Sequence, residues 1–219
     1  MEGFGTTERF VEVPWCLHRR GDAHRVLDIG YANADNTYLQ SLANLQVPEL
    51  YGLDIAPVKH ITVTLPDGSI RPLLTPVQGD VRETSFPDNF FDLIYCISTI
   101  EHIGMDNTGY RPATQDNAST CGDFEAIREL CRIVKPGGRL LVTVPFGKYQ
   151  DHGWFQQYDM NRLMRLVTST DFQISETHFF AYRNGWKECY PYDLKDVGYQ
   201  SNSAVNAAGL ACVELCKAA

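Results

Sequence analysis

The chain has 219 residues, of which 44% are hydrophobic and 21% charged, with 19 Lys and Arg against 27 Asp and Glu. This length and composition are typical of one globular domain whose core needs no disulfide or metal for stability. The formal net charge of -8 argues against binding along nucleic-acid phosphates or on anionic membrane surfaces. We therefore expect neither a nucleic-acid partner nor a membrane partner.

Three further features bear on location. The first ten residues contain two acids, one base and no apolar stretch, so they resemble neither a signal peptide nor a transit peptide. The longest apolar run, residues 90–100, is too short to cross a bilayer and includes Asp92. The seven cysteines are scattered without C-x-x-C spacing, which favours reduced thiols over a disulfide framework or a zinc site. We expect a cytoplasmic protein.

Short apolar runs that end in Gly or Asp alternate with amphipathic segments along the chain. This alternation predicts a parallel sheet covered by helices. After a helical lead-in at residues 7–18, near-continuous apolar segments predict buried strands at residues 25–30, 50–55, 74–79, 91–97, 139–144 and 172–180. A last strand, residues 209–216, is expected at an edge of the sheet. Amphipathic helices are expected at residues 35–45, 123–134 and 159–168.

Two turn signals complete this outline. Residues 57–72 alternate in polarity around a Pro-Asp-Gly turn, which predicts a hairpin where a crossover helix would be expected. At Lys135-Pro136-Gly137-Gly138 the proline ends the second amphipathic helix, and the glycines permit the reversal into the next strand. Because no linker composition divides the chain, we expect one domain.

The segment that carries chemistry follows the first expected strand. Asp28-Ile29-Gly30 ends that strand in a turn of small residues, and Asp54 ends the second strand. A strand that turns sharply into a helix aims backbone N–H groups at a ligand, and glycine lets the backbone approach it closely. An acid at the tip of the neighbouring strand can accept hydrogen bonds from both hydroxyls of a ribose. These features indicate a site for a nucleotide-like cofactor.

Further motifs follow in a fixed order. Gly79-Asp80 ends the third expected strand, residues 91–96 read FDLIYC and are followed by Glu101-His102-Ile103, and residues 134–141 read VKPGGRLL. Together with D-x-G at residues 28–30, this set resembles the class I S-adenosylmethionine-dependent methyltransferases over residues 25–180. The resemblance implies an α/β, Rossmann-like, doubly wound fold with a mostly parallel seven-stranded sheet and helices on both faces. Residues 1–24 would form the lead-in and residues 181–219 a C-terminal segment with the last strand.

The resemblance also implies S-adenosylmethionine as the cofactor. The loop with Asp28 and Gly30 would hold its amino-acid part, Asp54 would bind the ribose and Asp80 would accept from the adenine amino group. The implied cofactor-binding residues are Asp28, Gly30, Tyr31, Ala32, Asp54, Ile55, Asp80, Val81, Ile97 and Ser98. Tyr31 and Ala32 stand where the family usually has Gly-x-Gly.

Plainer roles stay open for some of these residues. Asp28 or Asp54 could cap the following segment. Glu101 is interpreted as a structural partner rather than a catalyst, and His102 as either a core histidine or a general base. A dinucleotide dehydrogenase is disfavoured, because the loop lacks the G-x-G-x-x-G cradle for a pyrophosphate.

The acceptor is expected to bind in loops beyond the fourth and fifth strands, where open α/β sheets bind ligands. Residues 104–123, rich in Asp, Asn, Thr and Gly, are a candidate lid or acceptor wall, with a solvated loop as the alternative. Residues 145–159 interleave aromatic and hydrogen-bonding side chains, which suits a sugar or another polyhydroxylated ring. The candidate substrate-binding residues are Tyr149, Trp154, Gln157, Tyr158, Tyr182 and Trp186.

Methyl transfer from a sulfonium is an in-line displacement, in which the protein positions the acceptor and can remove its proton. The preferred base is His152, because histidine titrates near neutral pH and this one lies in the polar acceptor loop beside Asp151. His102 is the second candidate. Asp106, Asp116 and Asp123 have oxygens for a divalent ion, but no ligand spacing predicts a metal site.

The sequence as a whole predicts methyl transfer to a hydroxyl or amine of a small molecule, such as a sugar or a secondary metabolite. Two alternatives stay open. One is a regulatory module that binds the cofactor without transferase activity, and the other is a protein methyltransferase that meets a basic partner with its acidic surface. Neither the acceptor atom nor the oligomeric state follows from the sequence.

Overall fold

The computed structural model describes residues 7–64, 67–108, 119 and 121–218. Most of the expected lid, including Asp116, lies outside the described residues. Among the helices of the described part, none combines the length and apolar character needed to span a membrane.

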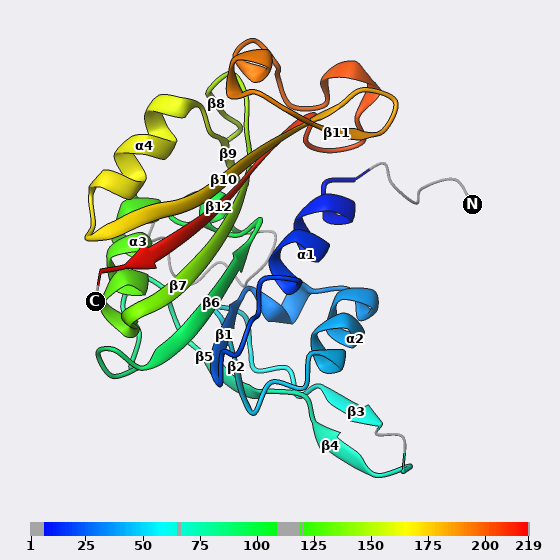
Figure 1. The fold of residues 1–219 in the computed structure, drawn as a ribbon, viewed down its shortest axis with the longest axis vertical. Coiled ribbons are helices and arrows are strands. Elements are labelled where there is room, and N and C mark those ends of the chain that lie inside the picture. Colours follow the sequence, from blue (N-terminus) through cyan, green and yellow to red (C-terminus); the bar gives the residue numbers. More distant parts are fainter. Residues whose placement is uncertain (1–6, 65–66, 109–118, 120, 219) are drawn as a thin grey trace.

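A central sheet of eight strands runs in the order β11-β10-β12-β7-β6-β1-β2-β5 (Figure 1). Its strands are β1 Arg25–Ile29, β2 Glu49–Asp54, β5 Thr75–Gln78, β6 Phe91–Ile97, β7 Val134–Pro145, β10 Phe172–Tyr182, β11 Trp186–Cys189 and β12 Gly209–Lys217. Strands β5, β2, β1, β6 and β7 pair in parallel, whereas β12 is antiparallel to β7 and β10. The expected mostly parallel sheet is therefore confirmed.

Two expectations about the sheet are wrong. It has eight strands rather than seven, because β11 adds to the outer edge by antiparallel pairing with β10. The sequence of β11, Trp-Lys-Glu-Cys, contains no apolar run that would reveal a strand. The strand expected at an edge, β12, lies between β7 and β10. Residues 209–215 of β12 are all buried, as is typical of a strand with neighbours on both sides.

Helices cover both faces of the sheet, as expected (Figure 1). The α-helices are α1 Arg9–Leu17, α2 Asn36–Asn44, α3 Gly122–Ile133 and α4 Met160–Thr168, and the short 3-10 turns are η1 Tyr31–Asn33, η2 Ile100–His102, η3 Pro191–Leu194 and η4 Ser201–Ser203. Trp15 of α1 and Leu42 of α2 are buried against one face. Leu130 of α3 and Leu163 of α4 are buried against the other.

Two small hairpins lie outside the main sheet. Strands β3 Thr62–Thr64 and β4 Ile70–Pro72 pair antiparallel and project away from the sheet at the lower right of Figure 1, which confirms the hairpin expected at residues 57–72. Strands β8 Gln150–Asp151 and β9 Gln156–Gln157 form the second hairpin, within the expected acceptor loop.

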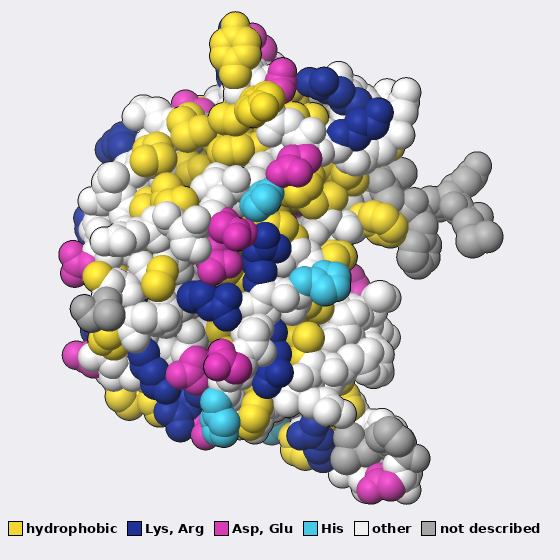
Figure 2. Space-filling view, in the orientation of Figure 1, with side chains coloured by type: hydrophobic (Ala, Val, Ile, Leu, Met, Phe, Trp, Pro, Cys, Tyr) yellow, Lys and Arg dark blue, Asp and Glu magenta, His cyan; other side chains and the backbone are white. Residues whose placement is uncertain are grey.

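Charged side chains of both signs cross the middle of the face seen in Figure 2. Over β10 and β12, Arg19 lies 2.7 Å from Glu176 and 3.6 Å from Glu214, and His178 lies 2.6 Å from Glu188. The partners Glu176 and Glu188 are exposed, so their ion pairs contribute little to stability, whereas Glu214 is nearly buried. This part of the sheet therefore presents a hydrated, mixed-charge surface.

The parallel strands bring their carboxyl ends to one edge of the sheet. The loops that follow β1, β2, β5, β6 and β7 consequently meet there, although they are far apart in the sequence. In open α/β folds this is the edge where ligands bind.

Candidate functional site

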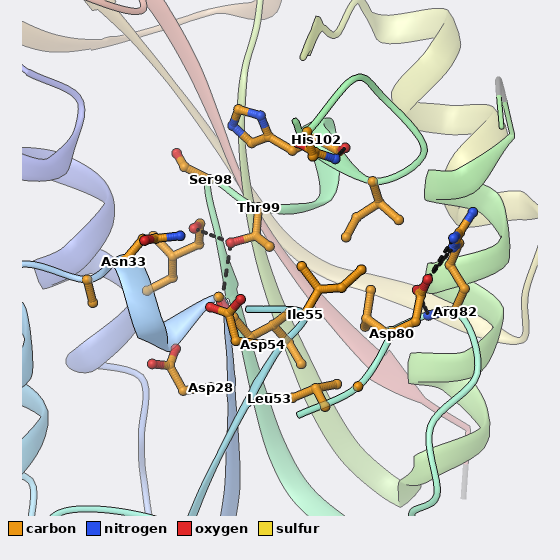
Figure 3. A pocket seen from close by; sticks show the side chains of 18 of the residues that line it. Asp28, Asn33, Leu53, Asp54, Ile55, Asp80, Arg82, Ser98, Thr99 and His102 are labelled. Carbon is orange, nitrogen blue, oxygen red and sulfur yellow. Dashed lines mark hydrogen bonds and ion pairs between the residues drawn. The ribbon is translucent and has the colours of Figure 1, made fainter. Parts of the chain in front are cut away.

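A cavity of about 290 Å³ opens at the carboxyl ends of β1, β2, β5 and β6 (Figure 3). Each of these ends contributes a polar side chain: Asp28 from β1, Asp54 from β2, Asp80 after β5 and Ser98 after β6. The predicted site residues that line the cavity are Asp28, Gly30, Asp54, Ile55, Asp80, Val81, Ile97, Ser98 and His102.

The loop after β1 reaches the cavity through Gly30 but turns Tyr31 away from it. Gly30 has φ +85°, and a Cβ there would lie 2.9 Å from Oγ1 of Thr99, so glycine is required. The Tyr31 ring is buried and lies over Gly52, where a Cβ would approach the ring to 2.7 Å. The Tyr31 hydroxyl accepts a hydrogen bond from the backbone N–H of Lys59 at 3.1 Å. The Tyr31 side chain is therefore part of the core and does not line the cavity.

Asp54 holds the same loop in place from the neighbouring strand. Its Oδ2 accepts from the backbone N–H of Ala32 at 2.9 Å, and its Oδ1 accepts from that of Ala56 at 2.9 Å. The side chain lines the cavity, and Figure 3 shows its carboxylate in the middle of the site. Ala32 itself supports the site through this N–H and does not line the cavity.

Asp28 presents a buried oxygen to the cavity. Its Oδ1 accepts from the hydroxyl of Tyr38 at 2.8 Å, whereas Oδ2 is buried and has no hydrogen-bond partner among the described residues. Burial raises the pKa of this carboxyl to about 7. A buried acceptor without a donor is unfavourable, so the site suits a ligand that brings an N–H group or a positive charge.

At the opposite end, Asp80 is fixed by Arg82. The guanidinium Nη2 lies 2.6 Å from Oδ2, and the backbone N–H of Arg82 donates to Oδ1 at 2.9 Å. Both residues line the cavity, as Figure 3 shows, and Val81 is buried beside them. These charge-assisted hydrogen bonds from Arg82 fix the orientation of the Asp80 carboxylate at the cavity wall.

The floor of the cavity is tied to helix α1 by a buried acid. Ser98 has φ +43°, a conformation that disfavours side chains other than glycine. Its hydroxyl donates to Oε2 of Glu12 at 2.8 Å, and Thr143 donates to the same oxygen at 2.7 Å. Glu12 is fully buried. Helix α1 therefore supports the strained residue at the exit of β6.

His102 lies between the cavity and the β8–β9 hairpin. Its Nδ1 donates to the backbone carbonyl of Trp154 at 2.9 Å, and the two rings are 5.1 Å apart. Burial lowers the pKa of His102, which favours the neutral imidazole. Glu101, the preceding residue, is buried, and burial raises the pKa of its carboxyl well above the usual value.

His152, the preferred base of the sequence analysis, does not line the cavity. Its ring stacks on Phe155 with centroids 4.4 Å apart and planes 2° from parallel, and burial lowers its pKa. The neighbouring Asp151 accepts from the backbone N–H of Gly153 at 2.7 Å, which stabilises the hairpin turn. His152 and Asp151 therefore contact residues of the hairpin itself, and neither side chain lines the cavity.

The predicted substrate-binding residues lie outside the cavity lining. Tyr158 donates to buried Asp123 at 2.6 Å, and Gln157 donates to the carbonyl oxygens of Lys148 and Val197, each at 2.8 Å. Tyr149 and Trp154 are each 42% exposed on the acceptor loop. Tyr182 and Trp186 face each other across β10 and β11, with ring centroids 5.7 Å apart.

Several cavity residues were missed by sequence reasoning: Arg9, Asn33, Tyr38, Thr99 and Asn107. Thr99 directly follows Ser98, the last predicted residue at the carboxyl end of β6, so extending that prediction by one residue would include it. Arg9 and Tyr38 come from helices, where an amphipathic pattern identifies the buried face but does not show which end reaches a cavity.

Comparisons with known proteins agree with this geometry. Residues 9–174 match a family model described as a methyltransferase domain. Over 140 residues, or 62% of this chain, the sequence is 30% identical to the ubiquinone/menaquinone biosynthesis C-methyltransferase UbiE of Pseudomonas aeruginosa. That match covers 47% of the relative, so the chain spans about half the length of the curated relatives it matches.

Solved structures share the fold at low sequence identity. The Burkholderia thailandensis 1,6-didemethyltoxoflavin-N1-methyltransferase, solved with its substrate and S-adenosylhomocysteine, gives a TM-score of 0.57 at 11% identity, over 94% of this chain and 77% of that one. The N-methyltransferase NodS of Bradyrhizobium japonicum gives 0.55 at 13% identity, over 96% and 86%. Because the family model spans well over half of the sequence, the chain belongs to the class I S-adenosylmethionine-dependent methyltransferases that its motifs resemble.

Proposed function

We propose that this chain binds S-adenosylmethionine and transfers its methyl group to a hydroxyl or amine of a small molecule, such as a sugar or a secondary metabolite. The observation that carries the proposal is one cavity in which Asp28, Asp54 and Asp80 follow each other at three strand ends. The P. aeruginosa relative, named for ubiquinone and menaquinone biosynthesis, supports a small-molecule acceptor. The 219 residues would act as one domain in the cytoplasm.

The residues of the cavity fit this cofactor. The buried Oδ2 of Asp28 suits its α-ammonium group. Each oxygen of Asp54 accepts one backbone N–H, which leaves lone pairs for the two ribose hydroxyls. Asp80, fixed by Arg82, is placed to accept from the adenine amino group. The three acids would therefore contact the two ends and the middle of one elongated ligand.

S-adenosylmethionine supplies a methyl group on a sulfonium, and the departing thioether is neutral. The protein must then align the acceptor and take its proton. His102 suits the second task, because the Trp154 carbonyl holds its Nδ1–H and so leaves the proton-accepting lone pair on Nε2. Its position in the cavity lining favours His102 over His152.

We expect the His102→Ala variant to lose about 100-fold in turnover, the lower range for removal of a general base. Its affinity for S-adenosylhomocysteine should stay within about threefold of the parent, measured by calorimetry. His152→Ala is the matched control and should keep nearly full turnover. His102→Gln, which can still donate to Trp154, separates a loss of the base from a loss of this contact. If His152→Ala loses more turnover than His102→Ala, the general base is His152 of the acceptor loop.

The proposed function is tested in two steps. Calorimetric titration with S-adenosylhomocysteine should show binding, and incubation with methyl-labelled S-adenosylmethionine and cell metabolites should label the small-molecule fraction, read by mass spectrometry. Label in the protein fraction would favour a protein methyltransferase. Binding without any transfer would favour a regulatory module. If millimolar ligand gives no binding, the cofactor assignment is wrong.

The affinity for S-adenosylhomocysteine should depend on pH through Asp28. In the free protein its pKa is about 7, so the carboxyl is largely protonated below that pH. Because an ammonium group prefers the ionised form, binding must release a proton there. We expect the affinity to level off above pH 7 and to fall about tenfold for each pH unit below it. Asp28→Asn should bind more weakly and remove this slope, whereas an unchanged slope would assign the titration to another group.

A further inference from the structure

We infer that the acceptor carries a protonated amino group, and that an acid cluster formed by Glu8, Glu12 and Glu101 binds this group where helix α1 meets the loop after β6. The inference rests on the proposed function, because it narrows the small-molecule acceptor of that reaction to an amine-bearing one. An ammonium group has no lone pair, so this group anchors the acceptor, and a hydroxyl or neutral amine beside it receives the methyl group.

The acid cluster lies at the carboxyl ends of β6 and β7. Glu101 belongs to η2, the first turn after β6, and Glu12 belongs to α1. Oε2 of Glu12 accepts from Ser98 at 2.8 Å and from Thr143 of β7 at 2.7 Å. Ser98 and His102, on either side of Glu101 in the chain, line the cofactor cavity, whereas Glu101 does not (Figure 3). The cluster therefore borders the cavity at the two strand ends after which the acceptor is expected.

Glu8 extends the acid cluster toward β12. It is the N-terminal cap residue of α1, and it is half-buried. Its Oε1 accepts from the side-chain amide of Asn206 at 3.4 Å, and Asn206 lies in the segment just before β12. Helix α1, η2 and this segment therefore enclose the cluster together.

Two oxygens of the acid cluster have no donor. Glu101 is 1% exposed, and its Oε2 is buried without a hydrogen-bond partner in the described part of the chain. The same is true of Oε2 of Glu8. Burial raises the pKa of Glu101 well above its usual value, and the charges of Glu12 and Glu8 raise it further. Because a buried acceptor without a donor is costly, this arrangement points to a ligand that brings N–H groups.

The charges of the cluster favour a cationic ligand. The guanidinium of Arg9 acts on all three carboxyl groups, and its Nη1 lies 3.3 Å from Oε1 of Glu12. The Arg9 side chain also lines the cavity, so the cluster and the cavity meet at this residue. Three carboxylates exceed the charge of one guanidinium, and a bound cation would compensate the difference.

The acid cluster suits an organic cation better than a metal ion. Within the described ranges, no group of three or more His, Cys, Asp or Glu side chains is arranged to hold a metal ion. Metal ions need several ligand atoms at short distances, whereas an ammonium group has three N–H donors that can rotate toward carboxylates on different elements. A primary amine is therefore the class of cation that this cluster accommodates best.

Fractionated metabolites test the chemical class of the acceptor. Cell metabolites are separated by cation exchange at neutral pH into a cationic fraction and a neutral and anionic fraction, and each is incubated with the protein and methyl-labelled S-adenosylmethionine. We expect at least about tenfold more label in products of the cationic fraction. Acetylation of the amino groups before the incubation removes their charge and should abolish this labelling.

The Glu101→Gln variant tests the site itself, because it keeps the size of the side chain and removes its charge. We expect the initial rate of labelling of the cationic fraction to fall about 10- to 100-fold, the effect of losing a hydrogen bond between charged groups. The affinity of the variant for S-adenosylhomocysteine, measured by calorimetry, should stay within about threefold of the parent. Glu8→Gln should lower the rate less, because this side chain is only half-buried.

Glu176→Gln is the matched control. It makes the same chemical change at a side chain of β10 that is 49% exposed and pairs with Arg19. We expect this variant to label the cationic fraction at the rate of the parent. If Glu101→Gln does not fold, acetylation of the metabolites and the Glu8→Gln variant still decide the question.

The outcomes separate the amine assignment from the proposed function. The amine assignment is overturned, while the cofactor site stands, if label is confined to the neutral and anionic fraction. A folded Glu101→Gln variant that labels the cationic fraction as fast as the parent would overturn it as well. Loss of labelling on addition of a chelator would assign the cluster to a metal ion instead. If the parent binds no S-adenosylhomocysteine, or binds it and labels no fraction, the proposed function itself fails.

Discussion

The Asp123→Ala variant is expected to lose about 3–5 kcal/mol of its free energy of unfolding, because removing one partner of a buried ion pair strands the other. Asp123 is fully buried at the start of α3. It accepts from Arg162 at 2.9 and 3.0 Å, from Tyr158 at 2.6 Å and from Gln156 at 3.1 Å. Urea denaturation followed by circular dichroism gives the measurement.

Glu125→Ala is the control for this experiment. It removes an acid from the same first turn of α3, but Glu125 is 44% exposed and lies 3.6 Å from Arg82. We expect a loss of at most about 1 kcal/mol. If Asp123→Ala were no less stable than this control, water molecules would have to accept the hydrogen bonds that the Asp123 carboxylate accepts in the parent protein. Tyr158 would then be available for a role other than holding α3 and α4 together.

The second large effect is expected at Asp54. Asp54→Ala should weaken S-adenosylhomocysteine binding about 100-fold or more, because it removes a nearly buried, hydrogen-bonded charge. The ribose loses its acceptor, and the backbone N–H groups of Ala32 and Ala56 lose theirs. Asp54→Asn, which keeps one oxygen, should fall between the variant and the parent. Calorimetric titration of each variant provides the dissociation constants.

An acid outside the site serves as the comparison. Asp22→Ala changes an exposed residue in the turn before β1 and should bind S-adenosylhomocysteine like the parent. If the affinity of Asp54→Ala for S-adenosylhomocysteine also stays within about threefold of the parent, the ribose must lie elsewhere. Asp54 would then only hold the backbone of the neighbouring loops in place.

The sequence pattern reveals most of the sheet because its strands are buried. The residues of β6 form an apolar run, and those of β12 are buried along most of the strand, so both are recognised easily. The sequence of β11 contains Lys187 and Glu188, which are exposed at the edge of the sheet. Edge position depends on strand order, which local sequence does not encode. The same reason explains why β12 was expected at an edge.

The site residues also fall into two groups, those that the local sequence predicts and those whose position depends on contacts with distant segments. Asp28, Asp54 and Asp80 are predictable, because a residue that ends a parallel strand must lie at the ligand-binding edge. The direction of Tyr31 depends on Gly52 in the neighbouring strand, whose missing side chain leaves space for the ring. The position of Arg9 depends on how α1 docks on the sheet. Such contacts between distant segments have no signature in the local pattern.

The sequence favoured His152 over His102 as the general base, whereas only His102 of the two lines the cavity. Both lie in segments expected near the acceptor, and both have neutral-pH chemistry. The pairing of Gln150 with Gln157 in the β8–β9 hairpin turns the His152 ring onto Phe155. The register of this hairpin decides which face each side chain takes, and the composition of the loop does not encode that register, so the sequence does not distinguish the two histidines.

The place of β12 has a consequence for how the protein is made. Its residues are the last of the sheet to leave the ribosome, yet they pair with both β7 and β10. Until then, the edges of β7 and β10 that pair with β12 have no partner strand. Exposed edges of this kind invite pairing with other chains. Closure of the sheet therefore waits for β12, and the nascent protein is most vulnerable to aggregation just before β12 appears.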